Sequence, residues 1–211
     1  MSQIKTVFID CDGVLYDKTL LTYEEMMTAC QQAGVDLGID WADVQKVREA
    51  LRAQGWRGWY NVALEVCRHA DVGFHQLAKK MVEYVDYTRL PFDPELLTLL
   101  QQVASQKDLF ILTNNTRPHL EKIFQHLFHK NIFQTGLKVF TVEDTLWGKY
   151  FYVKAHPEAF TKWCQKLHLK PQETLMIDDT EDVVKSAQNQ GLQTAFIPQS
   201  EDTKKVLKGL L

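Results

Sequence analysis

The hydrophobic pattern of the chain contains short apolar runs that no polar residue interrupts. The clearest of them lie at residues 7–9, 109–112, 175–177 and 195–197. None alternates between apolar and polar positions, which is typical of strands covered on both faces of a parallel sheet. We expect one further strand within residues 136–142.

Helical patterns, with apolar residues every three to four positions, separate the later runs. One helix is expected to begin after Thr116 and a second at Pro157. A third follows Thr180 and ends before Gly191, a residue type that often follows a helix end. A fourth is expected from about Pro94. Strands that alternate with helices predict an α/β fold in three layers, with a central parallel sheet.

A long helical stretch interrupts this alternation between the first two strands. From residue 18 to residue 89 the apolar positions fall at helical spacing, and no strand is expected there. A stretch of about 70 residues is too long for a single crossover connection. We therefore predict an α/β core domain formed by residues 1–17 and 90–211, and an inserted helical domain formed by residues 18–89.

Polar residues directly follow three of the predicted strands. Because the carboxyl ends of parallel strands share one edge of a sheet, and ligands of open α/β folds bind there, we expect these side chains to converge. In chain order they are Asp10, Asp12, Thr113, Asn114, Asp178 and Asp179.

The clustered carboxylates indicate phosphate chemistry. Like charges in one crevice raise each other's pKa unless a positive charge neutralises them. Oxygen ligands without a nearby His or Cys favour Mg²⁺, which keeps coordination positions for water and phosphate. Asp10 and Asp12 supply a carboxylate nucleophile and a second carboxyl group as acid and base, which is sufficient for an aspartyl phosphate. The alternative is that both aspartates only cap a turn.

Composition and charge narrow the classes of function. The 211 residues are 45% hydrophobic and 24% charged, as in ordinary globular proteins. With 24 basic and 27 acidic residues and no long run of like charge, we expect neither a nucleic-acid polymer nor a membrane as partner. No apolar run approaches roughly 18 residues, and no secretion signal is recognised. The scattered cysteines predict reduced thiols and a cytoplasmic protein; they are Cys11, Cys30, Cys67 and Cys164.

Motifs in four places together resemble those of the haloacid dehalogenase-like (HAD) superfamily. Residues 10–17, with the sequence DCDGVLYD, resemble its first motif, and Thr113-Asn114 resembles its second. Lys154 before a helix resembles the third motif, and Asp178-Asp179-Thr180 the acidic fourth. They occur in the family's order, each in the expected local context, over residues 4–197. The resemblance implies a Rossmann-like core with an inserted cap.

The resemblance implies roles in hydrolysis for the motif residues. Asp10 would be the nucleophile. Asp12 would protonate the leaving oxygen and then activate water. Thr113 would hydrogen-bond the transferred phosphoryl group with Asn114 nearby, and Lys154 would neutralise charge on the nucleophile and the phosphoryl oxygens.

It also implies a Mg²⁺ site. Asp10, the backbone carbonyl of Asp12 and Asp179 would hold the ion, and Asp178 would help directly or through a water molecule. Asp182 lies one helical turn after Asp179, so that it either supports the ion or complements the positive end of the helix.

A narrower resemblance is to the pyrimidine 5′-nucleotidase-like branch of subfamily I, whose helical C1 cap follows the first motif. The form DxDxxLY of residues 10–16 and the stretch KAHPEAF of residues 154–160 carry it. Branches that cleave carbon–halogen bonds lack an acid at the position of Asp12, so its presence favours phosphate monoesters. Ala155 replaces a common proline of the third motif, which leaves Lys149 as the alternative to Lys154.

This narrower resemblance adds candidates for substrate binding. Trp59 and Tyr60 belong to an aromatic stretch, residues 56–60, that could stack on a planar group or pack the helices internally. Tyr16 could touch the substrate or pack at the entrance to the helical segment. His156 could touch the phosphate or cap the following helix.

Three histidines share one predicted helix, at i, i+7 and i+10 spacing. They are His119, His126 and His129. Without a second group of ligands we expect them to form a surface stripe rather than a metal site.

We predict a Mg²⁺-dependent phosphatase that acts on a small phosphorylated metabolite, with a nucleoside 5′-monophosphate as the first candidate. The alternatives are a phosphomutase of the same fold and a non-catalytic protein that binds a ligand or partner. The sequence leaves open whether the protein is a monomer or a homodimer.

Overall fold

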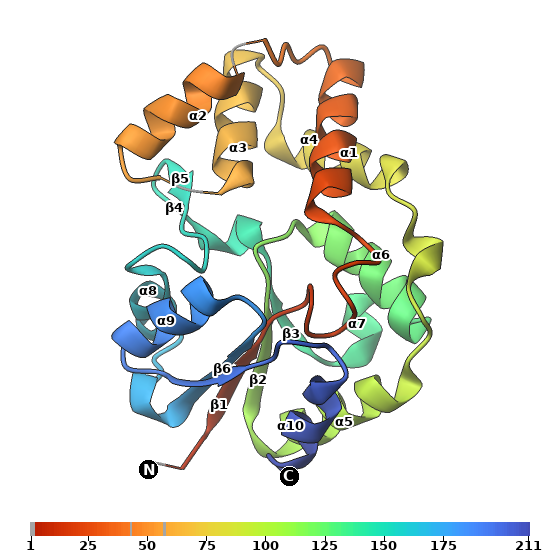
Figure 1. The fold of residues 1–211 in the computed structure, drawn as a ribbon, viewed down its shortest axis with the longest axis vertical. Coiled ribbons are helices and arrows are strands. Elements are labelled where there is room, and N and C mark those ends of the chain that lie inside the picture. Colours follow the sequence, from red (N-terminus) through yellow and green to blue (C-terminus); the bar gives the residue numbers. More distant parts are fainter. Residues whose placement is uncertain (1–2, 43, 57) are drawn as a thin grey trace.

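A computed structural model describes residues 3–42, 44–56 and 58–211. Among these residues, five strands form an entirely parallel sheet in the order β3–β2–β1–β6–β7 (Figure 1). The predicted α/β fold with a central parallel sheet is confirmed, including the further strand expected within residues 136–142. The strands are β1 (Thr6–Ile9), β2 (Asp108–Leu112), β3 (Lys138–Phe140), β6 (Thr174–Asp178) and β7 (Gln193–Phe196).

The strand order reverses at β1. In the register of the sheet, Ile9 lies opposite Ile111 of β2 on one side and Ile177 of β6 on the other. The chain therefore places the strands that follow β1 on both of its sides. The carboxyl end of β1 is the point at which ligands of open α/β sheets bind.

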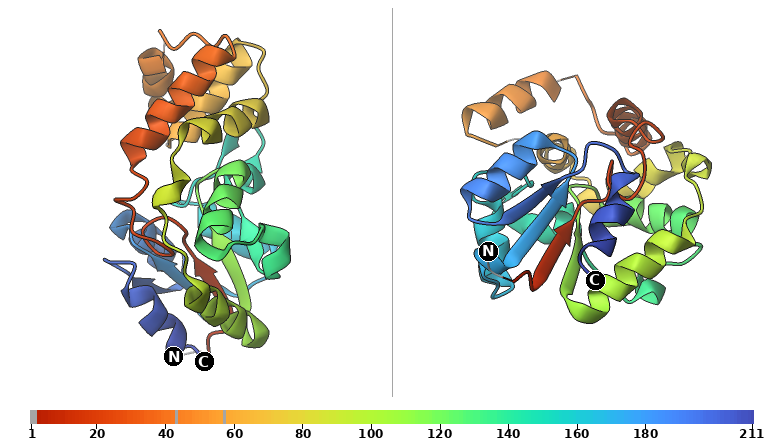
Figure 2. Two further views of the ribbon diagram at one scale, coloured as in Figure 1. Left: turned by 90° about the vertical axis from the view of Figure 1, so that its right-hand side faces the viewer. Right: turned by 60° about the horizontal axis from the view of Figure 1, so that its bottom comes forward.

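Alternate residues of the strands face two separate helical layers (Figure 2, right). Val7 and Ile9 pack in one apolar cluster with α5, α6 and α10, whereas Phe8 packs on the other face with α8 and α9. Since both faces are covered, the strands contain continuous apolar runs instead of alternating ones. The helices are α5 (Pro94–Gln106), α6 (Arg117–Phe128), α7 (Ile132–Thr135), α8 (Ala159–Lys166), α9 (Glu181–Asn189) and α10 (Asp202–Lys208).

The predicted helix ends agree with the structure except at α8. Thr116 precedes α6 as expected, and Gly191 follows α9 with a φ of +86°. The prediction that a helix opens at Pro157 was wrong by two residues. Backbone bonds between His156 and Val153, and between Ala159 and His156, close turns ahead of α8 and delay its start.

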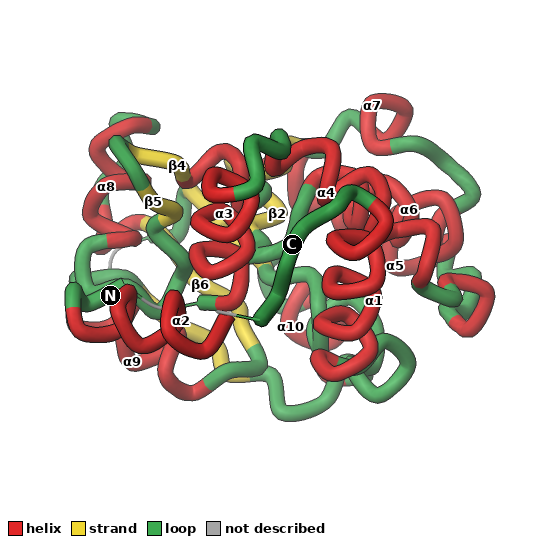
Figure 3. The backbone as a smooth tube through the Cα atoms, turned by 90° about the horizontal axis from the view of Figure 1, so that it is seen from above, coloured by secondary structure: helices red, strands yellow, loops and turns green. Residues whose placement is uncertain are grey.

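Between β1 and β2 the described residues form helices and no strand. The segment contains α1 (Tyr23–Asp36), α2 (Val44–Ala53), α3 (Trp59–His69) and α4 (Phe74–Met81), followed by two 3₁₀ turns. Seen from above, α3 lies over the ends of β2 and β6, and α1 and α4 lie to one side of them (Figure 3). The helices share an apolar cluster that also includes Tyr150. The division into two domains, residues 1–17 with 90–211 and residues 18–89, stays a prediction.

A short hairpin connects the helices with the sheet. Its strands are β4 (Leu146–Trp147) and β5 (Tyr150–Phe151), which pair antiparallel. The side-chain amide of Asn61 on α3 donates to the carbonyl of Phe151 at 3.0 Å and accepts from its N–H at 2.8 Å. Asn61 is buried, so both bonds lie away from water.

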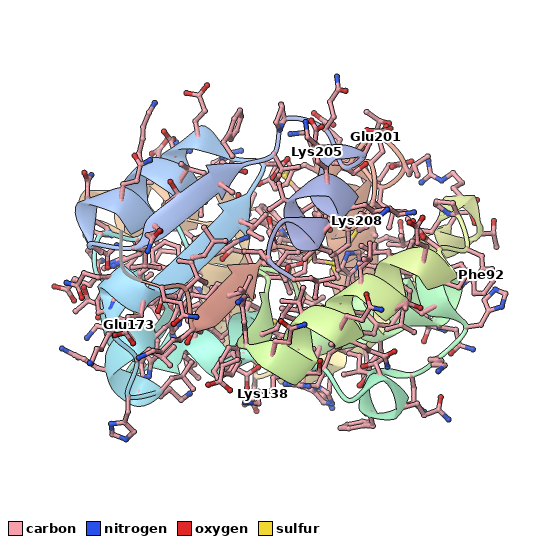
Figure 4. All side chains as sticks on the ribbon, turned by 90° about the horizontal axis from the view of Figure 1, so that it is seen from below. Phe92, Lys138, Glu173, Glu201, Lys205 and Lys208 are labelled. Carbon is pink, nitrogen blue, oxygen red and sulfur yellow. The ribbon has the colours of Figure 1, made fainter. Side chains whose placement is uncertain are left out.

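The amino-terminal end of the sheet, opposite the carboxyl ends of the strands, carries exposed charged side chains (Figure 4). Lys138 pairs there with Asp108 at 2.7 Å, and Lys5 pairs with Glu173 at 2.9 Å. No helix within the described residues is long and apolar enough to cross a membrane. The four cysteines are free thiols.

Candidate active site

Asp10 begins the site at the carboxyl end of β1. Its backbone N–H still donates to Ile177 at 2.9 Å, so the sheet fixes the position of the residue. One carboxylate oxygen, Oδ1, lies 2.6 Å from Nζ of Lys154, whose amine also lies 2.7 Å from Oδ2 of Asp178. Burial raises the pKa of Asp10; Lys154 opposes this, while Asp178 adds to it. One lysine therefore shares its charge between two buried acids.

Asp12 is held by side chains from several segments. Its Oδ1 accepts from the hydroxyl of Tyr16, and its Oδ2 accepts from Asn115 at 2.6 Å and from Thr113 at 3.3 Å. The ring Nε2 of His119 lies 3.6 Å from Oδ1. Burial alone would raise the pKa of Asp12, but the ring of His119 and the hydroxyl of Tyr16 lower it to about 2. The carboxylate is therefore ionised in the ligand-free protein.

Gly13 allows the loop after β1 to approach the fourth motif. Its φ is +76°, in the region that glycine adopts without strain, and a Cβ at this position would lie 2.2 Å from Oδ2 of Asp179. The same oxygen accepts from Nζ of Lys18 at 2.6 Å. A residue with a side chain at position 13 would displace Asp179.

Three carboxylates form the candidate metal site. Asp10, Asp178 and Asp179 each offer an oxygen, and these oxygens all lie within 4.8 Å of one another. An all-oxygen set of buried, crowded acids fits a hard divalent cation such as Mg²⁺. Asp182 is not part of this group. The backbone carbonyl of Asp12 as a further ligand stays a prediction.

The structure distinguishes between the two candidate lysines of the third motif. Nζ of Lys149 is exposed and lies 3.5 Å from Glu65. Lys154 is buried beside Asp10, and its backbone N–H donates to Oδ1 of Asn114 at 2.9 Å. Lys154 is thus the lysine that lies beside Asp10.

A cavity of about 630 Å³, here called the active-site cavity, opens between the strand ends and the helices. Its lining combines predicted motif residues with a set of apolar side chains. The polar lining includes Asp10, Asp12, Lys18, Asn114, Asn115, Lys154 and Asp179. The apolar lining includes Leu21, Met26, Met27, Trp59, Tyr60, Val153 and Val183.

The candidates for substrate binding divide into two groups. Trp59, Tyr60 and Asn114 line the active-site cavity. Tyr16 is 2% exposed and bonded to Asp12, so that it orients the acid instead of lining the cavity. The ring of His156 packs against Trp56 and Tyr152, with centroids 5.4 and 4.4 Å away, and does not line the cavity.

Thr113 is also absent from the cavity lining. Its hydroxyl donates to Asp12 and accepts from the N–H of Asn115 at 3.0 Å. In this ligand-free arrangement Thr113 therefore orders the loop after β2. The contact with a phosphoryl group that the family resemblance implies stays a prediction.

Several residues at the site escaped the sequence analysis. The prediction that the histidines form a surface stripe was wrong for His119. This residue is fully buried, and its ring Nδ1 forms a hydrogen bond of 2.7 Å with the hydroxyl of Tyr87. The cause is its place in the first turn of α6, against the loop that carries Asp12. Asn115 also binds the hydroxyl of Tyr60 at 2.9 Å and so connects α3 with the site. The adjacent pair Asn114-Asn115 was the sequence signal that could have identified Asn115 as a site residue. No feature of the sequence indicated that Tyr87 would contact the site.

A buried acid–lysine pair and adjoining carboxylates lie together at the carboxyl ends of the strands of a parallel sheet. The chain belongs to the haloacid dehalogenase-like hydrolases, whose sequence profile matches residues 4–191. This confirms the family and its enzymatic character, as the motifs predict. A search of curated proteins found no match to this sequence.

Solved structures of similar fold include a phosphate complex and a dehalogenase. CbbY from Rhodobacter sphaeroides, in complex with phosphate, is 18% identical, with a TM-score of 0.58 over 91% of this chain and 85% of that chain. L-2-haloacid dehalogenase from Xanthobacter autotrophicus is 19% identical, with a TM-score of 0.53 over 92% of this chain and 77% of that chain.

A further neighbour is the HAD family enzyme BT-2542 from Bacteroides thetaiotaomicron, in complex with magnesium and inorganic phosphate. It is 20% identical, with a TM-score of 0.51 over 92% of this chain and 93% of that chain. At these identities the likeness concerns the fold alone.

Proposed function

We propose that this protein is a Mg²⁺-dependent phosphatase that hydrolyses a small phosphomonoester through an aspartyl phosphate on Asp10. The observation that carries the proposal is that the carboxyl groups of Asp10 and Asp12 line one cavity together with Lys154 and Asp179. A nucleophile alone would serve a dehalogenase equally well. A second acid, Asp12, can protonate the ester oxygen that leaves, which a phosphatase requires.

In the first half-reaction, Oδ of Asp10 bonds to phosphorus while the bond between phosphorus and the ester oxygen breaks. Asp12 gives a proton to that oxygen, and the alcohol leaves. Because Asp12 is ionised in the ligand-free protein, it must gain this proton as the anionic substrate binds beside it and raises its pKa. Lys154 holds the attacking carboxylate in place and offsets the negative charge of the phosphoryl oxygens.

In the second half-reaction, Asp12 takes a proton from a water molecule whose oxygen bonds to phosphorus. The bond to Asp10 breaks, which restores its carboxylate and releases phosphate. Asp10, Asp178 and Asp179, with the carbonyl of Asp12, would hold Mg²⁺. When bound, the ion supplies positive charge that offsets the phosphoryl oxygens. The magnesium and phosphate in the BT-2542 complex support this chemistry for the family.

The apolar lining of the active-site cavity supports a substrate with a flat or apolar portion. Trp59 and Tyr60 contribute aromatic surface, and Met26 and Met27 contribute adaptable apolar surface. A nucleoside 5′-monophosphate suits this lining and the resemblance to the pyrimidine 5′-nucleotidase-like branch. The helices α1–α4 would act as the cap that covers such a substrate.

Phosphate release from a panel of monoesters tests the proposal. The panel contains pyrimidine and purine nucleoside monophosphates, sugar phosphates, phosphoglycolate and flavin mononucleotide, each with Mg²⁺ and with excess chelator. We expect Mg²⁺-dependent release, and a loss of about three orders of magnitude or more in Asp10→Asn. Asp202→Asn, an exposed aspartate outside the cavity, is the matched control and should retain full activity.

The outcomes separate the candidate functions. Equal release by Asp10→Asn and the unaltered protein would exclude the aspartyl phosphate. Isomerisation of a sugar phosphate without net release would favour a phosphomutase. Ligand binding with neither reaction would favour a non-catalytic role.

A further inference from the structure

A second cavity adjoins the active-site cavity within the helical segment. It has a volume of about 450 Å³ and is here called the arginine cavity. Tyr23, Gly58 and Trp59 line both cavities, so the two are neighbours with a shared wall. The described residues that line the arginine cavity are Tyr23, Arg48, Leu51, Arg52, Trp56, Gly58, Trp59 and Val62.

Two cations face this cavity from α2. Arg48 and Arg52 are four residues apart, so their side chains lie on one face of the helix, one turn from each other. Leu51 and Val62 provide an apolar floor. Paired guanidinium groups beside an apolar floor are suited to an anionic group at the end of a small molecule.

These two arginines differ from the other described arginines in lacking an acidic partner. Arg68 lies 2.9 Å from Glu65, and Arg117 lies 3.0 Å from Asp144. The guanidinium group of Arg89 lies 2.8 Å from the carboxylate of Glu25. No carboxylate of the described residues lies within 4 Å of Arg48 or Arg52. Among the described residues, no acid neutralises the charge of these two arginines.

The positive field of both arginines reaches the shared wall. Partial burial raises the pKa of the Tyr23 hydroxyl, whereas Arg48 and Arg52 each lower it. The ring of Tyr23 is 58% exposed and can donate its hydroxyl to a ligand anion beside the guanidinium groups.

We propose that the arginine cavity binds a second anionic group of the substrate, a phosphate or a carboxylate, at the end remote from the phosphoryl group that is hydrolysed. This rests on the proposed phosphatase function and narrows its substrate class to phosphomonoesters with two anionic ends. The middle of the molecule lies along Trp59, which both cavities share. A nucleoside 5′-monophosphate, which suits the active-site cavity, would fill that cavity alone, whereas a nucleotide with a second phosphate would fill both cavities.

Matched synthetic ligands test the length and the charge that the two cavities require. The probes are linear diol monophosphates, the corresponding bisphosphates, and phosphates of the corresponding hydroxy acids, each in a series of increasing chain length. Thymidine 5′-phosphate and thymidine 3′,5′-bisphosphate form the planar pair. The bisphosphates and the carboxylates distinguish the two possible sources of the second charge.

The first readout is binding by calorimetry to Asp10→Asn, which requires no turnover. At the best chain length, we expect the doubly anionic probe to bind about 10–100-fold more tightly than its monophosphate. When Arg48→Gln and Arg52→Gln are both introduced into Asp10→Asn, the ratio of the two affinities should fall to about one. Adding Lys46→Gln, which removes one charge from the same helix outside the cavity, should leave the ratio unchanged.

The second readout is kcat/KM with the catalytically intact protein. We expect the same preference for the doubly anionic ester and its loss in the double arginine variant. A preference in binding that depends on both arginines supports the second site even if no probe releases phosphate, in which case only the phosphatase function fails. A binding ratio of about one at every chain length, or a preference that survives the loss of both arginines, overturns the proposal even if phosphate is released.

Discussion

Side chains from separate segments surround the carboxyl group of Asp12 and determine its charge. Tyr16 comes from the loop after β1, Asn115 from the loop after β2, and His119 from the first turn of α6. His119 in turn is fixed by Tyr87 at 2.7 Å. The acid is thus oriented by Tyr16 from its own loop and by Asn115 and His119 from other segments.

Stability at low pH should depend on Asp12. Its pKa lies at about 2 in the folded protein, below the ordinary 3.8, so its contribution to stability is present above pH 3.8 and lost as the pH falls towards 2. Between about pH 5 and pH 3, the unaltered protein should lose about 1 kcal/mol more free energy of unfolding than Asp12→Asn. Urea unfolding at both pH values measures this, and equal losses in the two proteins contradict it.

The convergence that the sequence predicts for the acids at the strand ends is found in the structure. Asp10, Asp178 and Asp179 come together because a parallel sheet places its strand ends at one edge. His119 and Tyr87 take part through tertiary contacts between helices, which no local pattern records. The hydrophobic pattern around His119 does not distinguish a histidine that faces Asp12 from one that faces water.

Among the elements, the link between α3 and β5 holds the helices against the sheet. Asn61 bonds both the N–H and the carbonyl of Phe151, and it is buried between them. Trp56, just before α3, packs against Tyr150 at 4.8 Å and Tyr152 at 5.1 Å between ring centroids. Polar and aromatic contacts therefore reinforce the same junction.

Replacing Asn61 should loosen this junction. Asn61→Ala leaves the N–H and the carbonyl of Phe151 buried without these partners, which costs about 2–4 kcal/mol in the free energy of unfolding. Denaturant unfolding measures the change. Asn189→Ala at the exposed end of α9 is the control and should stay within about 0.5 kcal/mol of the unaltered protein. A loss as small as that of the control would show that the link contributes little.

The sequence predicts well those elements that have a continuous apolar run or a clear helical period. The strands of the sheet and the helices α5, α6 and α9 lie where the pattern places them. The β4–β5 hairpin was not predicted because each of its strands has two residues, too few to establish a period of two. Its strands are stabilised by contacts with α3, which only the folded chain provides.

For the whole molecule, the net charge of −3 conceals an uneven distribution. Carboxylates gather at the strand ends, Lys18 and Lys154 neutralise part of their charge, and Arg48 and Arg52 lie beyond them in the helical segment. A bound cation would complete the neutralisation at the strand ends.

Mg²⁺ should therefore raise the thermal stability of the ligand-free protein. At a concentration of one hundred times its Kd, the ion adds about 2.7 kcal/mol, and the midpoint temperature rises accordingly. We expect Asp179→Asn to remove most of this rise and excess chelator to reverse it in the unaltered protein. Asp182→Asn, outside the carboxylate group, should keep the rise. An equal rise in Asp179→Asn would place the ion elsewhere.

The junction at the β4–β5 hairpin constrains how this fold can be recombined. Phe151 is bonded to Asn61 of the helices, and Lys154, three residues further along, reaches Asp10 of the sheet. A chimera that takes residues 23–89 from one relative and everything else from another would join foreign helices to a mismatched hairpin, next to the lysine of the site. The part of the chain that must be exchanged as one unit is therefore discontinuous. It consists of residues 23–89 and residues 146–153.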